Sequence, residues 1–222
     1  MKKLFVQAIS KFALGVVLVG ALLFLPAGTV RWPGGLLFMA ILFIPMFCAG
    51  LVMLAKNPAL LESRLDAKEK RAAQDLVVKL SGLMFFVGFL LAGFDYRFGW
   101  TQLPDWAMKT AAGVFLLAYA LYAEVLRENT YLSRTIQVQE GQTVVDTGLY
   151  GIVRHPMYAV TVLLFLAMPL VLGSALSFVC FLPYPILIAR RIRDEEELLE
   201  EELKGYAEYK KKVKYRLVPL IW

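Results

Sequence analysis

The chain has 222 residues, of which 59% are apolar and 19% are charged, and its mean hydropathy is +0.62. Soluble domains are about 45–50% apolar and about 25% charged, so the composition argues against a soluble globular enzyme and also against a disordered chain. Two cysteines and a single histidine, His155, exclude a disulfide framework and a cysteine- or histidine-rich metal site, and we expect no bound metal. The sequence therefore predicts an integral membrane protein.

Charge-poor runs of about 20 residues mark the membrane spans, because a helix of that length crosses the hydrocarbon core. The first 126 residues contain four such runs: 12–30, 32–55, 76–94 and 106–126. A charge-free stretch of 35 residues then follows, from His155 to Ala189, with Gly173 and Ser174 near its middle. It is too long for one helix and short for two full crossings, so it predicts a helical hairpin over residues 156–189. The expected fold is all-α, with about six membrane-embedded helices, the last two forming the hairpin, and a helical C-terminal tail.

The distribution of Lys and Arg predicts the orientation. Of the 24 basic residues, only Arg31, Arg97 and Lys109 fall on one side of this layout. By the positive-inside rule, the other side is cytoplasmic and holds both termini. The basic start leads into a full-length span with no clear small-residue cleavage site, so we expect a retained helix rather than a signal peptide. The chain is short and compact in the bacterial style, which favours a bacterial inner membrane.

Polar residues divide the chain into two parts. The first part, residues 1–126, holds the four spans and a charged segment at 55–75 that we expect to be an interfacial amphipathic helix. Within this part, Arg31 followed by Pro33-Gly34-Gly35 predicts a tight turn between the first two spans, at the far surface. The second part, residues 127–222, collects the polar chemistry, and its stretch 135–142 predicts a turn between extended pieces. The net charge of +6 suits an anionic membrane surface better than nucleic acid, because the basic residues flank apolar segments.

Arg154-His155-Pro156 has the pattern of a helix start, with proline at the first helical position. A free helix N-terminus beside an arginine and a histidine favours binding of a carboxylate or phosphate. The alternative, which the residues leave equally open, is that Arg154 marks the membrane boundary and His155 caps the helix.

A charged helix is expected where the chain leaves the membrane, because three arginines at 190, 191 and 193 directly precede four acids. Helical spacing places Arg191 one turn before Glu195. A solvated helix that pairs its own charges is the alternative. Gly205 is expected to end this helix, and 206–214 to form a short second one.

Two separated motifs carry a resemblance to a known family. The first is Gly148-x-Tyr150-x-x-x-Arg154-His155-Pro156-x-Tyr158; the second, about 35 residues later, is Arg191-x-x-x-Glu195-Glu196-x-x-Leu199, followed by Gly205-Tyr206-x-x-Tyr209. In order and spacing they resemble the isoprenylcysteine carboxyl methyltransferase family, part of a wider group of membrane methyltransferases that includes phospholipid N-methyltransferases.

The resemblance implies an S-adenosylmethionine-dependent methyltransferase with a lipophilic or lipidated acceptor that reaches the site from the bilayer. The catalytic region is then 127–222, comprising the Arg-His-Pro segment, the hairpin, the Glu-Glu helix and the tail. The cofactor-binding residues implied are Gly148, Tyr150, Arg154, His155, Pro156, Tyr158, Glu195 and Glu196. The catalytic residues are expected to be Arg154, Arg191 and Glu195.

The chemical class of the acceptor is left open by the residues. A carboxylate needs no base but does need a cation, and Arg154, Arg191 and Arg193 are candidates. A lipid amine must lose a proton, which would give Glu195, Glu196 or His155 the role of a base. A non-catalytic lipid-binding protein on the same scaffold is the third possibility.

Two structural expectations follow. Arg154, His155, Tyr158, Glu195 and Glu196 should converge around one pocket at the cytoplasmic surface, because the hairpin returns the chain to its starting side, and Glu196→Ala should weaken cofactor binding without unfolding the protein. Small residues beside aromatics in the fourth span and the hairpin suggest a lateral gap for the acceptor, although ordinary close packing explains them equally well. These small residues are Ala118, Ala120, Ala123, Ala159 and Ala167.

Overall fold

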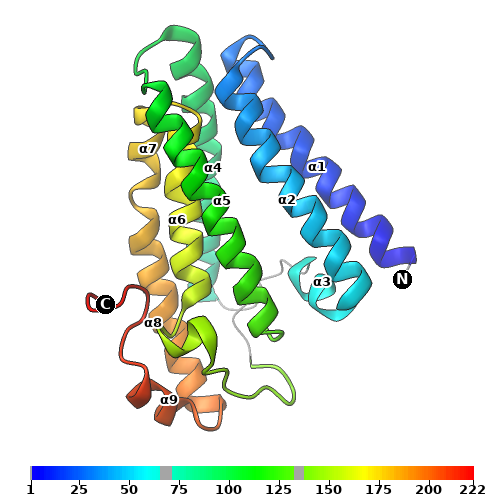
Figure 1. The fold of residues 1–222 in the computed structure, drawn as a ribbon, viewed down its shortest axis with the longest axis vertical. Helices are drawn as coiled ribbons and strands as arrows, with labels where there is room; N and C mark the ends of the chain where they lie inside the picture. Colours follow the sequence, from blue (N-terminus) through cyan, green and yellow to red (C-terminus); the bar gives the residue numbers. More distant parts are fainter. Residues whose placement is uncertain (1, 66–71, 133–137) are drawn as a thin grey trace.

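A computed structural model describes residues 2–65, 72–132 and 138–222, and within these residues the regular structure is entirely helical (Figure 1). The predicted all-α fold is thus confirmed. The helices are α1 (Lys2–Ala27), α2 (Pro33–Lys56), α3 (Pro58–Leu65), α4 (Ala72–Phe98), α5 (Asp105–Glu128), α6 (Pro156–Val171), α7 (Ala175–Phe181), α8 (Tyr184–Glu202) and α9 (Tyr206–Lys212), with a 3-10 turn, η1, at Gly148–Gly151. Both ends of the chain lie at the same end of the molecule, together with α3 and α9 (Figure 1).

In the described part of the chain, five segments are long and apolar enough to cross a membrane: α1, α2, most of α4, α5, and α7 together with α8. The sixth, α6, has 16 residues and rises about 24 Å, short of a hydrocarbon core of about 30 Å. The predicted hairpin is confirmed, with its turn at Gly173, whose φ is +79°, and Ser174, whose Oγ accepts from the backbone N of Ser177. The second arm consists of α7 and α8. It was expected to end near residue 189, but α8 continues without a break through Glu195 and Glu196 to Glu202.

The expected turn between the first two spans is present at Arg31, but Pro33-Gly34-Gly35 does not belong to it. The turn lies at residues 28–32, and Pro33 opens α2 at a position where its missing N–H costs nothing. The glycines instead permit close packing within the first turn of α2. A Cβ on Gly35 would lie 2.7 Å from the indole of Trp32, and one on Gly34 would lie 3.3 Å from the carbonyl oxygen of Val171.

The core lies among α4, α5, α6, α7 and α8, whereas α1 and α2 expose most of their apolar surface, as expected of helices that face lipid. The most extensive helix–helix contact joins α5 to α6. Ala118 and Ala167 are buried in the core, so at these two positions the small residues serve close packing rather than a gap. Ala120 and Ala123 are exposed on α5.

The segment expected to be interfacial contains α3, whose Leu60 and Leu61 are buried. The rest of that expectation falls partly on residues 66–71, outside the described residues. The expected turn at 135–142 is present at Gly141, whose φ is +73°, while residues 133–137 also lie outside the description.

Candidate functional site

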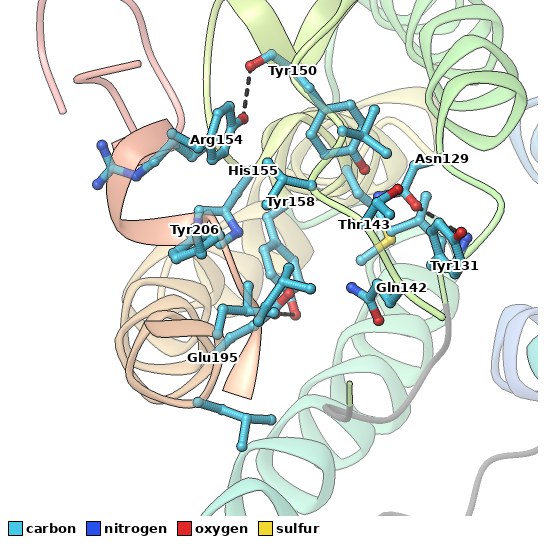
Figure 2. A pocket seen from close by; sticks show the side chains of 18 of the residues that line it. Asn129, Tyr131, Gln142, Thr143, Tyr150, Arg154, His155, Tyr158, Glu195 and Tyr206 are labelled. Carbon is cyan, nitrogen blue, oxygen red and sulfur yellow. Dashed lines mark hydrogen bonds between the residues drawn. The ribbon is translucent and has the colours of Figure 1, made fainter. Parts of the chain in front are cut away.

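A cavity of about 90 Å³ lies at the end of the molecule that holds both termini, where the start of α6, the second half of α8, α9 and the segment before η1 meet (Figure 2). Its walls include six of the predicted site residues, namely Tyr150, Arg154, His155, Tyr158, Arg191 and Glu195. Gly148, Pro156 and Glu196 are not among its lining residues. The two motifs therefore meet in space as predicted, but their members do not all face the cavity.

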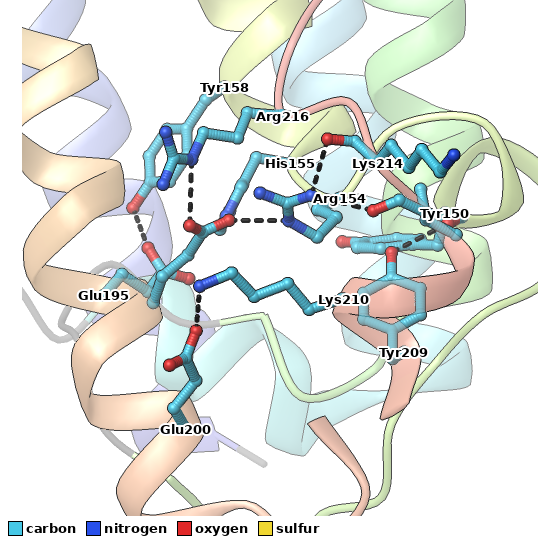
Figure 3. A network of polar contacts seen from close by, with 12 residues as sticks. Tyr150, Arg154, His155, Tyr158, Glu195, Glu200, Tyr209, Lys210, Lys214 and Arg216 are labelled. Atoms are coloured by element: carbon cyan, nitrogen blue, oxygen red, sulfur yellow. Dashed lines mark hydrogen bonds and ion pairs between the residues drawn. The ribbon is translucent and has the colours of Figure 1, made fainter. Parts of the chain in front are cut away.

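A buried ionic network behind the cavity includes Arg154, His155 and Arg216 (Figure 3), and Glu196 pairs with all three. It is 2% exposed, and its Oε1 accepts from Arg154 Nε at 2.7 Å and lies 3.1 Å from His155 Nε2. Its Oε2 accepts from Arg216 Nε at 2.8 Å. A carboxylate this deeply buried needs such partners, because removing an ion from water is costly unless its charge is compensated. Glu196 thus holds the Arg-His segment to α8.

The C-terminal segment completes this anchor. Arg154 Nη1 donates to the carbonyl oxygens of Val213 and Lys214 at 2.7 and 2.8 Å. The backbone N–H groups of Arg154 and His155 donate to the carbonyls of Tyr215 and Arg216, both at 2.9 Å. The chain after α9 therefore lies as a strap along the Arg-His segment. His155 occupies the N-cap position of α6, but its side chain makes no capping bond and pairs with Glu196 instead.

A second polar chain faces the cavity itself. Arg191 Nε donates to the Tyr158 hydroxyl at 2.9 Å, and that hydroxyl donates to Glu195 Oε2 at 2.5 Å. The expected helical spacing places Arg191 and Glu195 on one face of α8, and α6 supplies Tyr158 between them. This trio combines a cation, a hydroxyl and a carboxylate in the wall of the cavity, which suits recognition of a polar ligand.

The short helix α9 contributes two tyrosines that sequence reasoning did not place in the site. The Tyr209 hydroxyl donates to the carbonyl of Tyr150 at 2.7 Å. The Tyr206 hydroxyl is buried, its residue being 4% exposed, and it has no hydrogen-bond partner among the described residues. Burial, reinforced by the carboxylates of Glu196 and Glu195, raises the pKa of Tyr206 above its usual range, so the hydroxyl stays protonated. Because buried polar groups are normally hydrogen-bonded, this hydroxyl is suited to donate to a polar ligand that enters the cavity.

Further lining residues were also missed, because they lie outside the motifs. Asn129, Tyr131, Gln142 and Thr143 face the cavity from the segments that flank residues 133–137, across from Glu195 and Tyr206 (Figure 2). The motif Gly205-Tyr206-x-x-Tyr209 did carry a usable signal for the two tyrosines. The polar residues before η1 carried none.

Gly148 contributes to the site through the backbone. Its φ is +50°, and a Cβ there would lie 1.4 Å from Glu128 Oε1, while Glu128 Oε2 accepts from the backbone N of Leu149 at 3.0 Å. The glycine lets η1 sit against the end of α5 and so positions Tyr150. Similarly, Pro156 opens α6 at its first position. Among the described residues, no group of three or more His, Cys, Asp and Glu is arranged to hold a metal ion.

Comparison with known proteins agrees with the motifs. Residues 109–201 match the model of the isoprenylcysteine carboxyl methyltransferase (ICMT) family. The chain is also 32% identical over 91 residues to the Delta(14)-sterol reductase TM7SF2 of Mus musculus, which covers 40% of this chain and 22% of that protein. It is 24% identical over 136 residues to the Delta(14)-sterol reductase of Methylotuvimicrobium alcaliphilum, covering 54% of this chain and 32% of that protein. The chain thus spans a third or less of the length of these curated relatives. Over residues 109–201, which hold both the Arg-His-Pro and the Glu-Glu motifs, the chain is a match to the isoprenylcysteine carboxyl methyltransferase family.

Proposed function

We propose that this chain is a membrane methyltransferase that uses S-adenosylmethionine and transfers a methyl group to a lipophilic acceptor, with a carboxylate such as a prenylcysteine-like compound as the preferred class. The observation that carries the proposal is the cavity at the end of the membrane helices, which is lined mostly by residues of the matched region. Tyr158, Arg191 and Glu195 are among them. By the charge distribution, we place this end of the molecule on the cytoplasmic side.

The residues around the cavity fit such a cofactor. The Tyr206 hydroxyl needs a polar partner, and the carboxylate of Glu195 suits a ribose hydroxyl or an ammonium group. Leucines 198, 199 and 203, with Val144, provide apolar wall for a flat aromatic group. When bound, S-adenosylmethionine supplies an electrophilic methyl group attached to a sulfonium.

Transfer to a carboxylate requires little chemistry of the protein. The acceptor oxygen would gain the methyl group and the sulfonium would leave as a neutral thioether, so no proton would need to move. The chain need only orient the acceptor and exclude water. Of the three candidate arginines, Arg191 best suits this role, because it lines the cavity beside Tyr158 and Glu195. Arg193 is absent from the cavity lining, and Arg154 holds the C-terminal segment.

Two other reactions are kept as alternatives. Methylation of a lipid amine requires a base, and Glu195 is a carboxylate in the cavity wall. The two relatives described above are named sterol reductases, which favours reduction of a lipophilic substrate as a second candidate function. That reaction needs a hydride donor in place of a methyl donor.

The experiment is a methyl-transfer assay on the purified protein in lipid nanodiscs, using S-adenosylmethionine labelled with tritium in the methyl group. The acceptors are an S-prenylated N-acetylcysteine and native membrane lipids. A base-labile labelled product is expected, and a base-stable product would instead indicate an amine acceptor. Arg191→Gln should abolish most of the transfer, whereas Arg190→Gln, an exposed neighbour on α8, should not. Binding of a reduced nicotinamide dinucleotide without binding of S-adenosylmethionine would overturn the proposal in favour of reduction.

A further inference from the structure

The short helix α3, which no motif includes, lies against the wall of the cavity. Leu60 and Leu61 are its buried residues. On the next turn, the Ser63 hydroxyl contacts the carbonyl oxygen of Leu132 at 3.4 Å, and Leu132 lines the cavity. Helix α3, which follows α2 and precedes α4 in the chain, thus lies beside the site.

Arg64, near the end of α3, points at the helices that form this wall. Its Nη2 donates to the Tyr122 hydroxyl on α5, and its guanidinium carbon lies 5.6 Å from the centroid of the Tyr122 ring. Its Nη1 lies 3.9 Å from the sulfur of Met157 on α6, and Met157 lines the cavity. The guanidinium therefore lies immediately outside the cavity, among α3, α5 and α6.

Polar side chains continue from Arg64 to the site. Tyr184, a buried residue of α8, lies within electrostatic range of both Tyr122 and Arg191. Arg191 in turn donates to Tyr158. Two arginines thus stand at the two ends of a row of tyrosines, at the point where apolar helices reach the site. Ionisable residues in such surroundings are costly and usually functional.

We propose that Arg64 determines acceptor specificity by binding the anionic head group of the acceptor as it passes from the bilayer, between α3 and the α5–α6 pair, to Arg191. This inference rests on the proposed function, because it assumes a lipophilic acceptor for the cavity. A planar guanidinium binds a carboxylate through two parallel hydrogen bonds, and its charge would select an anionic head group over a neutral one of the same shape. Because Arg64 contacts Tyr122 on α5 and Met157 on α6, a head group bound by it would lie at the junction of α3 with these two helices.

The test compares the binding of two probes that differ only in charge, an S-prenylated N-acetylcysteine and its primary amide, in nanodiscs of zwitterionic lipid. The measured quantity is the ratio of the two dissociation constants, which requires neither turnover nor cofactor. The wild-type protein should prefer the carboxylate. Arg64→Gln should lower that preference about tenfold, and Arg64→Lys should lower it less, because a lysine keeps the charge but loses the paired hydrogen bonds.

Two further variants separate recognition from a structural role. Tyr122→Phe removes the hydroxyl that holds Arg64 but leaves the charge, so the carboxylate preference should persist. Arg31→Gln, an exposed arginine at the other end of the molecule, should change nothing. If Arg64→Gln weakens the binding of both probes equally, or if Tyr122→Phe lowers the carboxylate preference as Arg64→Gln does, Arg64 only holds α3 in place. The inference is then overturned. An unchanged ratio in Arg64→Gln also overturns it.

A third arm separates a carboxylate from a lipid phosphate, the other anion that a guanidinium binds. If phosphatidylglycerol in the nanodisc binds in an Arg64-dependent way while the carboxylate and amide probes bind alike, the assignment to an acceptor carboxylate is wrong. Failure of the proposed function would look different: no methyl transfer from S-adenosylmethionine to any acceptor, with an Arg64-dependent carboxylate preference still present.

Discussion

Two buried carboxylates stand at opposite ends of the helical assembly, and their surroundings differ. Asp95, 1% exposed on α4, accepts from the backbone N of Thr101 at 2.6 Å and from the hydroxyls of Thr101 and Ser174. In the part of the chain that the structure describes, these donors are all neutral. Glu196, at the other end, pairs with Arg154, Arg216 and His155.

The difference shows how one fold uses buried acids for two purposes. The Asp95 cluster joins α4, the connection after it and the turn before α7, and so closes the end of the bundle away from the cavity. The Glu196 cluster neutralises an arginine that would otherwise be buried alone, and it leaves Tyr158, Arg191 and Glu195 to face the cavity. The charged residues of a motif therefore divide into those that anchor the segment and those that face a ligand.

The largest expected effect is that of Glu196→Ala. The substitution leaves Arg154 buried without its counter-ion, so the free energy of unfolding should fall by about 3–5 kcal/mol. This revises the sequence-based expectation that the variant stays folded and only loses cofactor affinity. Equilibrium unfolding in mixed micelles measures the loss, with Glu197→Ala, an exposed neighbour, as the control. Equal stability of the two variants, with cofactor affinity lost only in Glu196→Ala, would return Glu196 to the binding site.

Asp95→Asn should have a smaller effect and should leave the cavity untouched. The new amide group opposes a hydroxyl or N–H donor, so the variant should lose about 1–3 kcal/mol of unfolding free energy. Cofactor affinity, measured by calorimetry on the folded protein, should not change. Asp105→Asn, an exposed acid at the start of α5, is the matched control. A loss of affinity in Asp95→Asn would mean that the two ends are coupled.

Gly148→Ala tests the backbone that joins the anchor to the cavity wall. The new Cβ would displace Glu128 and break its bond to Leu149, in addition to the strain of the positive φ. Gly141→Ala is the control, because its φ is +73° but its Cβ would meet nothing within 4 Å. The difference in unfolding free energy between the two should be about 1 kcal/mol. If the two variants are equally stable, Glu128 does not hold η1.

Tyr206→Phe should have the smallest effect on stability and a selective one on binding. Its hydroxyl has no partner among the described residues, so the unfolding free energy should change by less than about 0.5 kcal/mol. The dissociation constant for S-adenosylmethionine should rise about fivefold, and this difference should be constant between about pH 6 and about pH 9, because the raised pKa keeps the hydroxyl protonated.

Tyr209→Phe is the counterpart of that variant. It removes the hydrogen bond to Tyr150 and should cost about 1 kcal/mol of stability instead. If Tyr206→Phe binds the cofactor as tightly as the wild type, the hydroxyl does not face that ligand.

Much of the architecture was predictable, because the signals for it are local. A run such as 106–126 has the length and apolarity that a bilayer demands, and α5 covers it. Pro156 opens α6 and Gly205 precedes α9 for conformational reasons that each residue carries by itself. The predicted hairpin returns the chain to the side of the membrane where it started. This was also enough to predict that the two motifs meet.

The tertiary structure alone decided what each motif residue does after the motifs meet. Arg154 and Glu196 are 42 residues apart, and the carbonyls of Val213 and Lys214 that also bind Arg154 are further still. Hydropathy and spacing do not encode which of two adjacent acids is buried. They also do not encode that the Tyr206 hydroxyl has no hydrogen-bond partner among the described residues. The sequence determined which groups reach this end of the molecule, because helix length and hairpin closure are local properties. Their division into anchor and cavity wall depends on side-chain packing between distant segments, which exists only in the folded chain.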